Sequence, residues 1–167
     1  HVVVGRDADR VQGFLGERAQ YVLQIQRLGT GHAVMQARSA LAGNGTEAVL
    51  VFYADMPLVT EATMRKLLDL HARNVHDGGV LSMLTFESSN PRGFGRVVRS
   101  TAGDVLAIVE EVDCTPQQAR LTELNPGLYC YQAAWLGENR DRIPVSRKGE
   151  YYLTDLVGIA VGQGSRI

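Results

Sequence analysis

The sequence has little of what disulfide-stabilised, membrane-bound or nucleic-acid-binding proteins need. Only two of its 167 residues are cysteine, and Cys114 and Cys130 form neither a Cys-x-x-Cys motif nor a metal-ligand pair. We therefore expect a reduced, cytoplasmic chain, with a single disulfide as the alternative. No apolar run approaches the roughly 20 residues of a membrane span, and no signal peptide is visible. The formal net charge of -1 gives no sign of a surface that binds nucleic acids or membranes.

The sequence also lacks a Ser-His-Asp or Cys-His arrangement, internal repeats, linkers and low-complexity tracts. Its composition, with 45% apolar and 21% charged residues, is that of an ordinary soluble protein. A chain of this length can bury a sizeable core without disulfides or metals. We expect residues 1–167 to form a single domain.

The order of the expected elements favours an α/β fold. Up to residue 86 the pattern alternates between strands and helices, which indicates βαβ units in a three-layer sandwich. The strands are expected at 1–5, 21–26, 49–53 and 80–86. The helices are expected at 9–14 with Asp9 as the N-cap, from 29 to about 41, and at 61–74 with Thr60 as the N-cap. Residues 96–99 and 105–109 then predict an inserted hairpin, and further elements are expected at 116–120, 128–131, 133–142 and 155–161.

Asp55 follows a nearly continuous apolar run that begins at Val49, and Pro57, two residues later, ends the expected strand. Such a run is typical of a strand buried on both faces of a parallel sheet, and ligands bind at the carboxyl ends of such strands. A carboxylate at this position often binds a metal ion, a hydroxyl or an amide. The alternative is an aspartate that caps the following turn, and the local sequence does not decide between them.

Two glycine-containing segments are candidates for binding or for simple turns. Gly29 and Gly31 flank Thr30 at the start of a helix, where a ligand could approach backbone amides, although a tight turn capped by Thr30 explains the pattern equally simply. Glycines at 93 and 95 could let a backbone come close to a ligand, or give a flexible hairpin entry. The segments at 44–45 and 125–127 are turn signals.

Taken in order, these motifs closely resemble one family. The matching segments are Gln24 together with 28–33, and then 53–58, 91–99, 108–111, 125–127 and 149–155. They resemble the uridylyltransferase domain of bacterial N-acetylglucosamine-1-phosphate uridylyltransferases, with motif order and spacing intact from about Tyr21 to Asp155. Each motif alone is weak, but six in register are a specific match.

The resemblance implies a fold and a reaction. The fold is a Rossmann-like three-layer α/β/α nucleotidyltransferase fold with a mixed, mainly parallel sheet and an inserted β-hairpin. The reaction joins UTP and N-acetylglucosamine 1-phosphate into UDP-N-acetylglucosamine, a precursor of peptidoglycan and lipopolysaccharide, with release of pyrophosphate. It proceeds by Mg²⁺-dependent in-line attack on the α-phosphate of UTP. Positioning and charge neutralisation carry such reactions, so no protein nucleophile is required.

The resemblance also implies the site residues. Asp55 would be the Mg²⁺ ligand and the catalytic residue, in keeping with the preference of Mg²⁺ for carboxylates. The substrate-binding residues would be Gln24, Gly29 and Thr30 for uracil; Tyr53, Ala54 and Asp55 at the junction of nucleotide and sugar; Gly95, Glu110 and Asn125 for N-acetylglucosamine; and Tyr152 and Thr154 near the sugar or its phosphate. A carboxylate and an amide suit sugar hydroxyls, which both donate and accept hydrogen bonds.

Two parts of the family pattern are absent. The family begins with a glycine-rich loop and a lysine that hold the triphosphate, and nothing in residues 1–20 matches them. A second Mg²⁺ ligand, an asparagine, would lie beyond residue 167. Both ends of the sequence look cut. We therefore predict that this chain alone is nearly inactive, unless the real protein contains the missing parts.

Smaller departures loosen the substrate assignment. Ala54 and Pro126 replace residues that are commonly glycine and threonine or serine in the family, and Val112 replaces a common lysine. The alternatives are another sugar-1-phosphate nucleotidyltransferase, of the glucose or dTDP type, or a non-catalytic domain that binds sugar nucleotides. The family often carries a further acetyltransferase domain, through which the protein could form a homo-oligomer.

Overall fold

The computed structural model describes residues 1–41 and 45–167, so Asn44 of the predicted turn lies outside the described residues. The chain forms two compact units. The first unit comprises His1–Thr46 and Leu136–Leu153, and the second comprises Glu47–Trp135 and Thr154–Ile167. Each unit is described by itself below.

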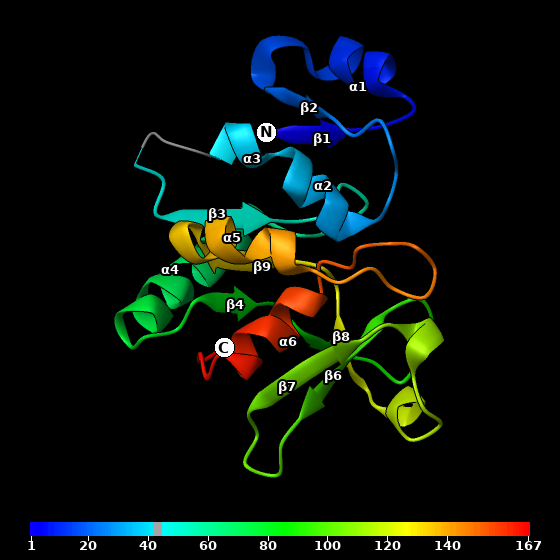
Figure 1. Cartoon of the computed structure of the whole chain (residues 1–167), viewed down its shortest axis with the longest axis vertical. Helices are drawn as coiled ribbons and strands as arrows, with labels where there is room; N and C mark the ends of the chain where they lie inside the picture. The colour runs from blue at the N-terminus through cyan, green and yellow to red at the C-terminus, as the bar shows by residue number, and fades with distance from the viewer. Residues whose placement is uncertain (42–44) are drawn as a thin grey trace. The chain divides into compact units, whose positions relative to one another are not determined.

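The first unit contains a short βαβ motif. Its elements are β1 (Val2–Val4), α1 (Ala8–Leu15), η1 (Gly16–Arg18), β2 (Tyr21–Leu23), α2 (Thr30–Gln36), α3 (Arg38–Leu41) and η4 (Arg140–Arg142). Strands β1 and β2 pair in parallel, with Val2 opposite Tyr21 (Figure 1). The backbone N–H of Gln24 donates to Val4 over 2.8 Å just beyond the strand. Strand β2 is shorter than predicted because its partner strand ends there.

The first two helices begin and end differently from the prediction. Asp7, not Asp9, is the residue that precedes α1, and Asp9 lies in the first turn. Helix α2 begins with Thr30 after Gly29, and Ala37 separates it from α3. The predicted continuous helix to residue 41 is therefore two shorter helices.

The second unit contains two sheets and two long helices. Its elements are β3 (Ala48–Val51), α4 (Glu61–His76), β4 (Leu81–Met83), β5 (Phe86–Glu87), β6 (Gly95–Arg99), β7 (Val105–Val109), η2 (Glu111–Asp113), η3 (Gln118–Arg120), β8 (Glu123–Asn125), β9 (Tyr129–Gln132) and α6 (Asp155–Gly162). One sheet has the order β3-β9-β4 and the other β5-β8-β6-β7. Helix α5 (Ala133–Asn139) carries the chain from the second unit into the first.

Local signals specify α4 and the β6–β7 hairpin. Thr60 caps α4 through a hydrogen bond from the Thr63 N–H to its hydroxyl, as the sequence predicts. Leu67 and His71 are buried on the inner face of α4, whereas Leu68 is exposed. The β6–β7 hairpin is confirmed, and α6 packs against β7.

The α/β fold is confirmed, but the prediction of a mainly parallel sheet is wrong for the strand pairs that the structure describes. Only β1 and β2 pair in parallel, and the pairs in the other two sheets are antiparallel. The reason is β9, which lies between β3 and β4 and runs antiparallel to both. The two neighbours of β9 still run in the same direction as each other, so the fold is mixed.

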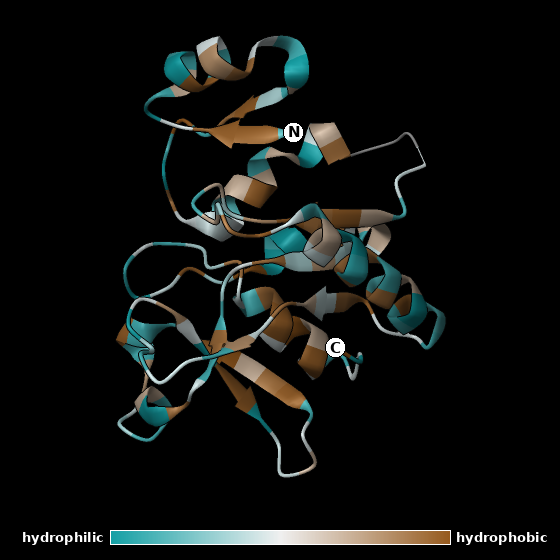
Figure 2. Cartoon of the chain, turned by 180° about the vertical axis from the view of Figure 1, so that it is seen from behind, coloured by the Kyte–Doolittle hydropathy of each residue, from teal (hydrophilic) through white to brown (hydrophobic). Residues whose placement is uncertain are grey.

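The core of the second unit gathers on its strands and on α6. Leu81, Leu124, Leu128, Tyr129 and Tyr131 are completely buried. Figure 2 shows hydrophobic residues concentrated on the strands, while hydrophilic residues recur along α4. In the described part of the chain, no helix combines the length and apolar character needed to cross a membrane.

The predicted strand before Asp55 is shorter and less buried than expected. Strand β3 ends at Val51, and Phe52 is 49% exposed. Because β3 is an edge strand of its three-stranded sheet, only Val49 is fully buried. The segment that carries Tyr53 and Asp55 is therefore a loop beyond the sheet.

Candidate functional site

In the first unit, the Gly-Thr-Gly segment is fastened to a distant part of the chain. The Gly31 N–H donates to the Tyr151 carbonyl over 2.8 Å, and the Tyr151 N–H donates to the Leu28 carbonyl over 2.7 Å. The Leu153 N–H donates to the Thr30 hydroxyl over 3.0 Å. Thr30 therefore holds residue 153, and it does not cap its own helix as the simple alternative predicted.

The glycine at position 29 is required by the chain itself. Its φ is +99°, in the region that favours glycine, and a Cβ there would lie 2.6 Å from the Tyr151 carbonyl oxygen. A Cβ at Gly31 would lie 3.0 Å from the same oxygen. The sequence predicted that a ligand would come close to this backbone, and the close neighbour in the structure is the 151–153 segment.

Gln24 lies next to this segment with its amide orientation fixed. Its Nε2 donates to the Gly29 carbonyl over 3.1 Å and contacts Nδ1 of His32 at 2.9 Å. Since both contacts use the amide nitrogen, the side-chain Oε1 remains as an acceptor. The ring of His32 stacks on Tyr151 at a centroid distance of 6.1 Å, and Tyr152 follows as a half-buried residue. The structure thus brings Gln24, Gly29 and Thr30 together.

In the second unit, Glu110 lies at the end of β7 and is held by Thr154. The Thr154 hydroxyl, whose residue is 3% exposed, donates to Glu110 Oε1 over 2.8 Å. A Cβ built on Gly95 would lie 2.9 Å from Ile108 Cγ2 and 3.8 Å from Glu110 Oε2. Burial, together with the nearby Glu110 charge, raises the pKa of Asp155 above its ordinary value. Glu110, Gly95 and Thr154 therefore lie close together.

Asn125 lies at the end of β8 and is 7% exposed. Its Oδ1 accepts a hydrogen bond from the Gly127 N–H over 3.2 Å, which leaves the amide nitrogen as the donor group of the side chain. Gly127 has a φ of +91°, and a Cβ there would overlap the ring of Tyr53. The turn after Asn125 and the ring of Tyr53 are thus packed directly against each other.

Asp55 is exposed in a turn that follows Tyr53 and Ala54. Among the described residues, no three or more His, Cys, Asp and Glu side chains are grouped as a metal site. The Asp55 carboxylate therefore does not belong to a metal site made entirely of protein ligands in the described part of the chain. It does fit Mg²⁺, which is commonly held by one or two carboxylates with water and substrate phosphates supplying the rest.

The sequence did not single out Tyr151 and Glu111. Tyr151 makes the backbone contacts to Leu28 and Gly31, but its partners lie more than a hundred residues away, so no local signal points to them. Glu111 contacts the loop before β6, and its only sequence signal was its position beside Glu110.

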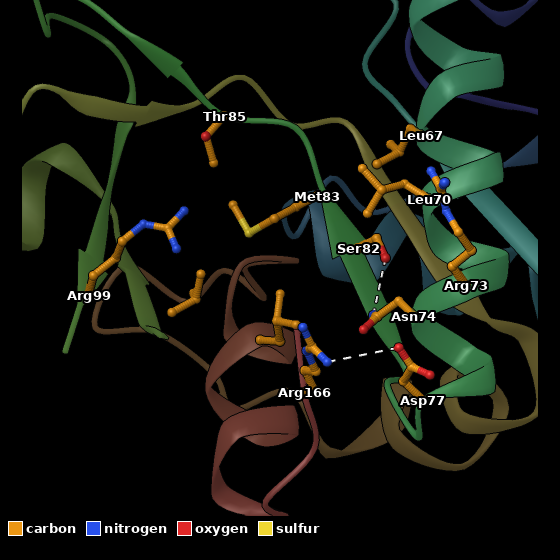
Figure 3. A pocket seen from close by; sticks show the side chains of 12 residues that line it. Leu67, Leu70, Arg73, Asn74, Asp77, Ser82, Met83, Thr85, Arg99 and Arg166 are labelled. Carbon is orange, nitrogen blue, oxygen red and sulfur yellow. Dashed lines mark hydrogen bonds and ion pairs between the residues drawn. The ribbon is translucent and has the colours of Figure 1, made fainter. Parts of the chain in front are cut away.

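The second unit also contains a pocket of about 320 Å³ between α4, β4 and β7 (Figure 3). Asn74 donates to the Ser82 hydroxyl over 3.2 Å, and Arg166 lies 3.9 Å from Asp77 at its rim. None of the predicted site residues lines it. The pocket is separate from the candidate site.

The fold is that of a nucleotidyltransferase domain. Two solved structures of UDP-glucose pyrophosphorylase, one without ligand and one complexed with UDP-glucose, superpose with TM-scores of 0.72 and 0.68. Each alignment covers 99% of this chain, and it covers 70% of the first solved chain and 69% of the second. Because the sequence identities are only 15% and 17%, these matches establish the fold alone.

The nucleotidyl transferase family model matches residues 8–166, so the chain belongs to the nucleotidyl transferase family. It is 43% identical to the bifunctional protein GlmU of Geobacter metallireducens and 39% identical to that of Enterococcus faecalis, in each case over 99% of this chain. The chain spans 34% and 35% of the length of these relatives. The matches confirm the family resemblance that the motifs indicated.

Proposed function

We propose that the protein containing this chain transfers a uridylyl group from UTP to N-acetylglucosamine 1-phosphate. The observation that carries the proposal is the fixed amide of Gln24. Its Nε2 is engaged with Gly29 and His32, which leaves Oε1 as an acceptor for a ligand. Uracil carries a donor at N3, whereas cytosine carries an acceptor there, so this orientation favours uracil.

The residues of the second unit support a sugar as the other substrate. Glu110 accepts from Thr154 at one oxygen, and its other oxygen lies near the backbone of Gly95. Asn125 keeps its amide nitrogen as a donor because Gly127 occupies its oxygen. A carboxylate and an amide with these roles match sugar hydroxyls and the carbonyl of an N-acetyl group.

The proposed reaction needs positioning more than covalent chemistry. An oxygen of the sugar 1-phosphate attacks the α-phosphorus of UTP, the bond to the β-phosphate oxygen breaks, and pyrophosphate leaves with that electron pair. Glu110 and Asn125 orient the sugar, and Gln24 orients the base. Asp55 would hold Mg²⁺, which when bound supplies neutralisation of the phosphate charges.

The experiment is a pyrophosphate-release assay on the full-length protein. UTP with N-acetylglucosamine 1-phosphate is compared with UTP and glucose 1-phosphate, and with dTTP and glucose 1-phosphate. Preference for the first pair is expected. Preference for another pair would favour a different sugar-1-phosphate nucleotidyltransferase, which the departures at Ala54 and Pro126 support. Tight binding of UDP-N-acetylglucosamine without turnover would favour a non-catalytic binding domain.

We further propose that the protein works in the cytoplasm. Cys114 and Cys130 are both free thiols in the structure, which suits a reducing compartment. Burial raises the pKa of the Cys130 thiol to about 11, so this cysteine remains an uncharged core residue.

A further inference from the structure

Glu110 and Glu111 are consecutive, yet their side chains serve different parts of the second unit. Glu110 accepts from Thr154, whereas Glu111 Oε2 accepts from the Gly93 N–H over 3.0 Å. Glu110 has extended backbone angles and precedes the 3-10 turn η2, which begins at Glu111. The chain therefore turns between the two residues, and their carboxylates contact different segments.

The contact of Glu111 belongs to a small network that includes a buried cation. The Arg96 side chain is 3% exposed and lies 3.4 Å from Glu111 Oε1 through Nη2. Its Nη1 donates to the Phe94 carbonyl. A guanidinium this deeply buried needs a charged partner, and Glu111 is the carboxylate it contacts. The hydrogen bond from Gly93 and the contact with Arg96 lower the pKa of Glu111 below its ordinary value.

Residues 91–94, called the 91–94 loop below, are held at three points, two of which belong to this network. Glu111 holds the Gly93 N–H, Arg96 holds the Phe94 carbonyl, and the Phe94 ring packs edge-on against Phe86 at a centroid distance of 5.0 Å. Gly93 has a φ of +83°, so this loop conformation is one that most residues do not adopt. The loop leads directly into Gly95, which lies beside Glu110.

We propose that Arg96 and Glu111 form a positioning pair for the sugar half of the site, an inference that rests on the proposed function. The pair touches no substrate. It fixes the 91–94 loop so that the backbone at Gly95 and the carboxylate of Glu110 keep the spacing that sugar binding needs. Its loss weakens binding of the sugar 1-phosphate and leaves UTP binding, whose proposed base contacts lie in the first unit, unchanged.

The matched control is the ion pair between Arg99 and Glu123. It joins the same strand β6 to β8, with Nε–Oε2 and Nη2–Oε1 distances of 2.7 Å. Arg99 lies at the opposite end of β6 from the 91–94 loop. Glu123→Ala therefore removes an arginine–glutamate pair of the same sheet without touching that loop.

The test is steady-state kinetics on the full-length protein with each substrate varied in turn. Glu111→Ala is expected to raise KM for N-acetylglucosamine 1-phosphate about five- to tenfold, with kcat and KM for UTP within about twofold of wild type. Glu111→Gln, which keeps an acceptor for Gly93 but no charge for Arg96, is expected to raise that KM by a smaller factor. Glu123→Ala is expected to leave all three constants unchanged. Amide hydrogen exchange at residues 93–95 is expected to become faster in Glu111→Ala alone.

The outcomes separate this inference from the function on which it rests. If the wild-type protein transfers uridylyl groups and Glu111→Ala has the same KM for N-acetylglucosamine 1-phosphate, the positioning role alone is overturned. An equal rise of KM in Glu111→Ala and Glu123→Ala would also overturn it, because general weakening of the β5-β8-β6-β7 sheet would then explain both. A fall in kcat without a change in KM contradicts it as well. A wild-type protein without activity or sugar-nucleotide binding would overturn the proposed function and this inference together.

Discussion

The hydroxyl of Thr154 donates to the carboxylate of Glu110 over 2.8 Å and joins residues that are 44 positions apart. The donor is 3% exposed, whereas the acceptor is half-buried. A buried donor on a helix start thus fixes a carboxylate at the end of a strand. This is the geometry expected of a carboxylate that orients a ligand, because its own rotamer is held by a neighbour.

Removing this hydroxyl is expected to affect stability and sugar binding together. Thr154→Val keeps the shape of the side chain but leaves Glu110 without its donor. The free energy of unfolding is expected to fall by about 1 to 2 kcal/mol, in the range of hydrogen bonds to charged groups. The affinity for UDP-N-acetylglucosamine is expected to fall about tenfold, measured by calorimetric titration. Thr154→Ser retains the hydroxyl and is the control. An equal loss of affinity in Thr154→Val and Thr154→Ser would contradict the role of the hydrogen bond.

A methyl group at Gly127 is expected to displace the ring of Tyr53. Gly127→Ala adds a Cβ that overlaps this ring and imposes an alanine on a φ of +91°. The expected loss of unfolding free energy is about 2 to 3 kcal/mol, part from backbone strain and part from the overlap. Gly103→Ala is the control, since its φ is +93° but open space surrounds it. Its expected cost is about 1 kcal/mol, from strain alone. Equal costs in urea denaturation would argue against the overlap.

The stability of the second unit is expected to decline in mild acid through His71. This side chain is buried, its Nδ1 contacts the Ser82 hydroxyl at 3.1 Å, and burial lowers its pKa below the ordinary value of 6.5. Between that ordinary value and the lower folded-state pKa, the unfolded chain binds a proton that the folded chain does not. Stability from this group is therefore present above the ordinary pKa of 6.5 and is lost as the pH falls through 6.5 toward the lower folded-state pKa.

The measurement is the free energy of unfolding at several pH values between about 7.5 and 5. His71→Gln is expected to flatten the pH dependence, whatever its effect on stability at neutral pH. His76→Gln alters an exposed histidine on the same helix and is expected to keep the wild-type slope. A slope unchanged by His71→Gln would exclude His71 as its source.

Asp55→Asn is expected to affect turnover and leave stability unchanged. Asp55 is exposed in a turn, so replacing its carboxylate by an amide removes the proposed metal ligand and no packing. In the full-length protein we expect kcat to fall by about a hundredfold or more, with a higher Mg²⁺ requirement. The thermal midpoint without metal is expected to match wild type. Wild-type kcat in Asp55→Asn at low Mg²⁺ would remove Asp55 from the proposed metal site.

Local chemistry explains which elements were predictable from the sequence. The start of α4 followed from Thr60 because a capping hydrogen bond involves residues three positions apart. The β6–β7 hairpin followed from a turn with Gly103, for the same reason. The antiparallel insertion of β9 between β3 and β4 did not follow, since strand order depends on contacts between segments far apart in the chain.

The same distinction applies to the candidate site. Residue types such as Gln24, Asp55 and Glu110 were identified through a family resemblance, and the assigned ligands of these residues remain proposals. The geometry around them was beyond the reach of the sequence: no local pattern indicates that Gly29 accommodates Tyr151 or that Glu111 holds Gly93. These contacts are set by tertiary packing, which is why the sequence favoured a ligand or a simple turn at those positions.

The fastening of the Gly29–Gly31 segment to Tyr151 also determines the order in which the first unit can form. During synthesis the ribosome releases β1, β2 and α2 long before it makes residues 136–153, so the early half of this unit waits without its partner while the segment between them emerges and folds. Closing so long a loop is slow compared with forming a hairpin. The base-binding half of the proposed site precedes the second unit in the sequence, but it is therefore completed after the sheets of that unit. In a nascent chain interrupted before residue 151, this base-binding half is exposed to chaperones and proteases.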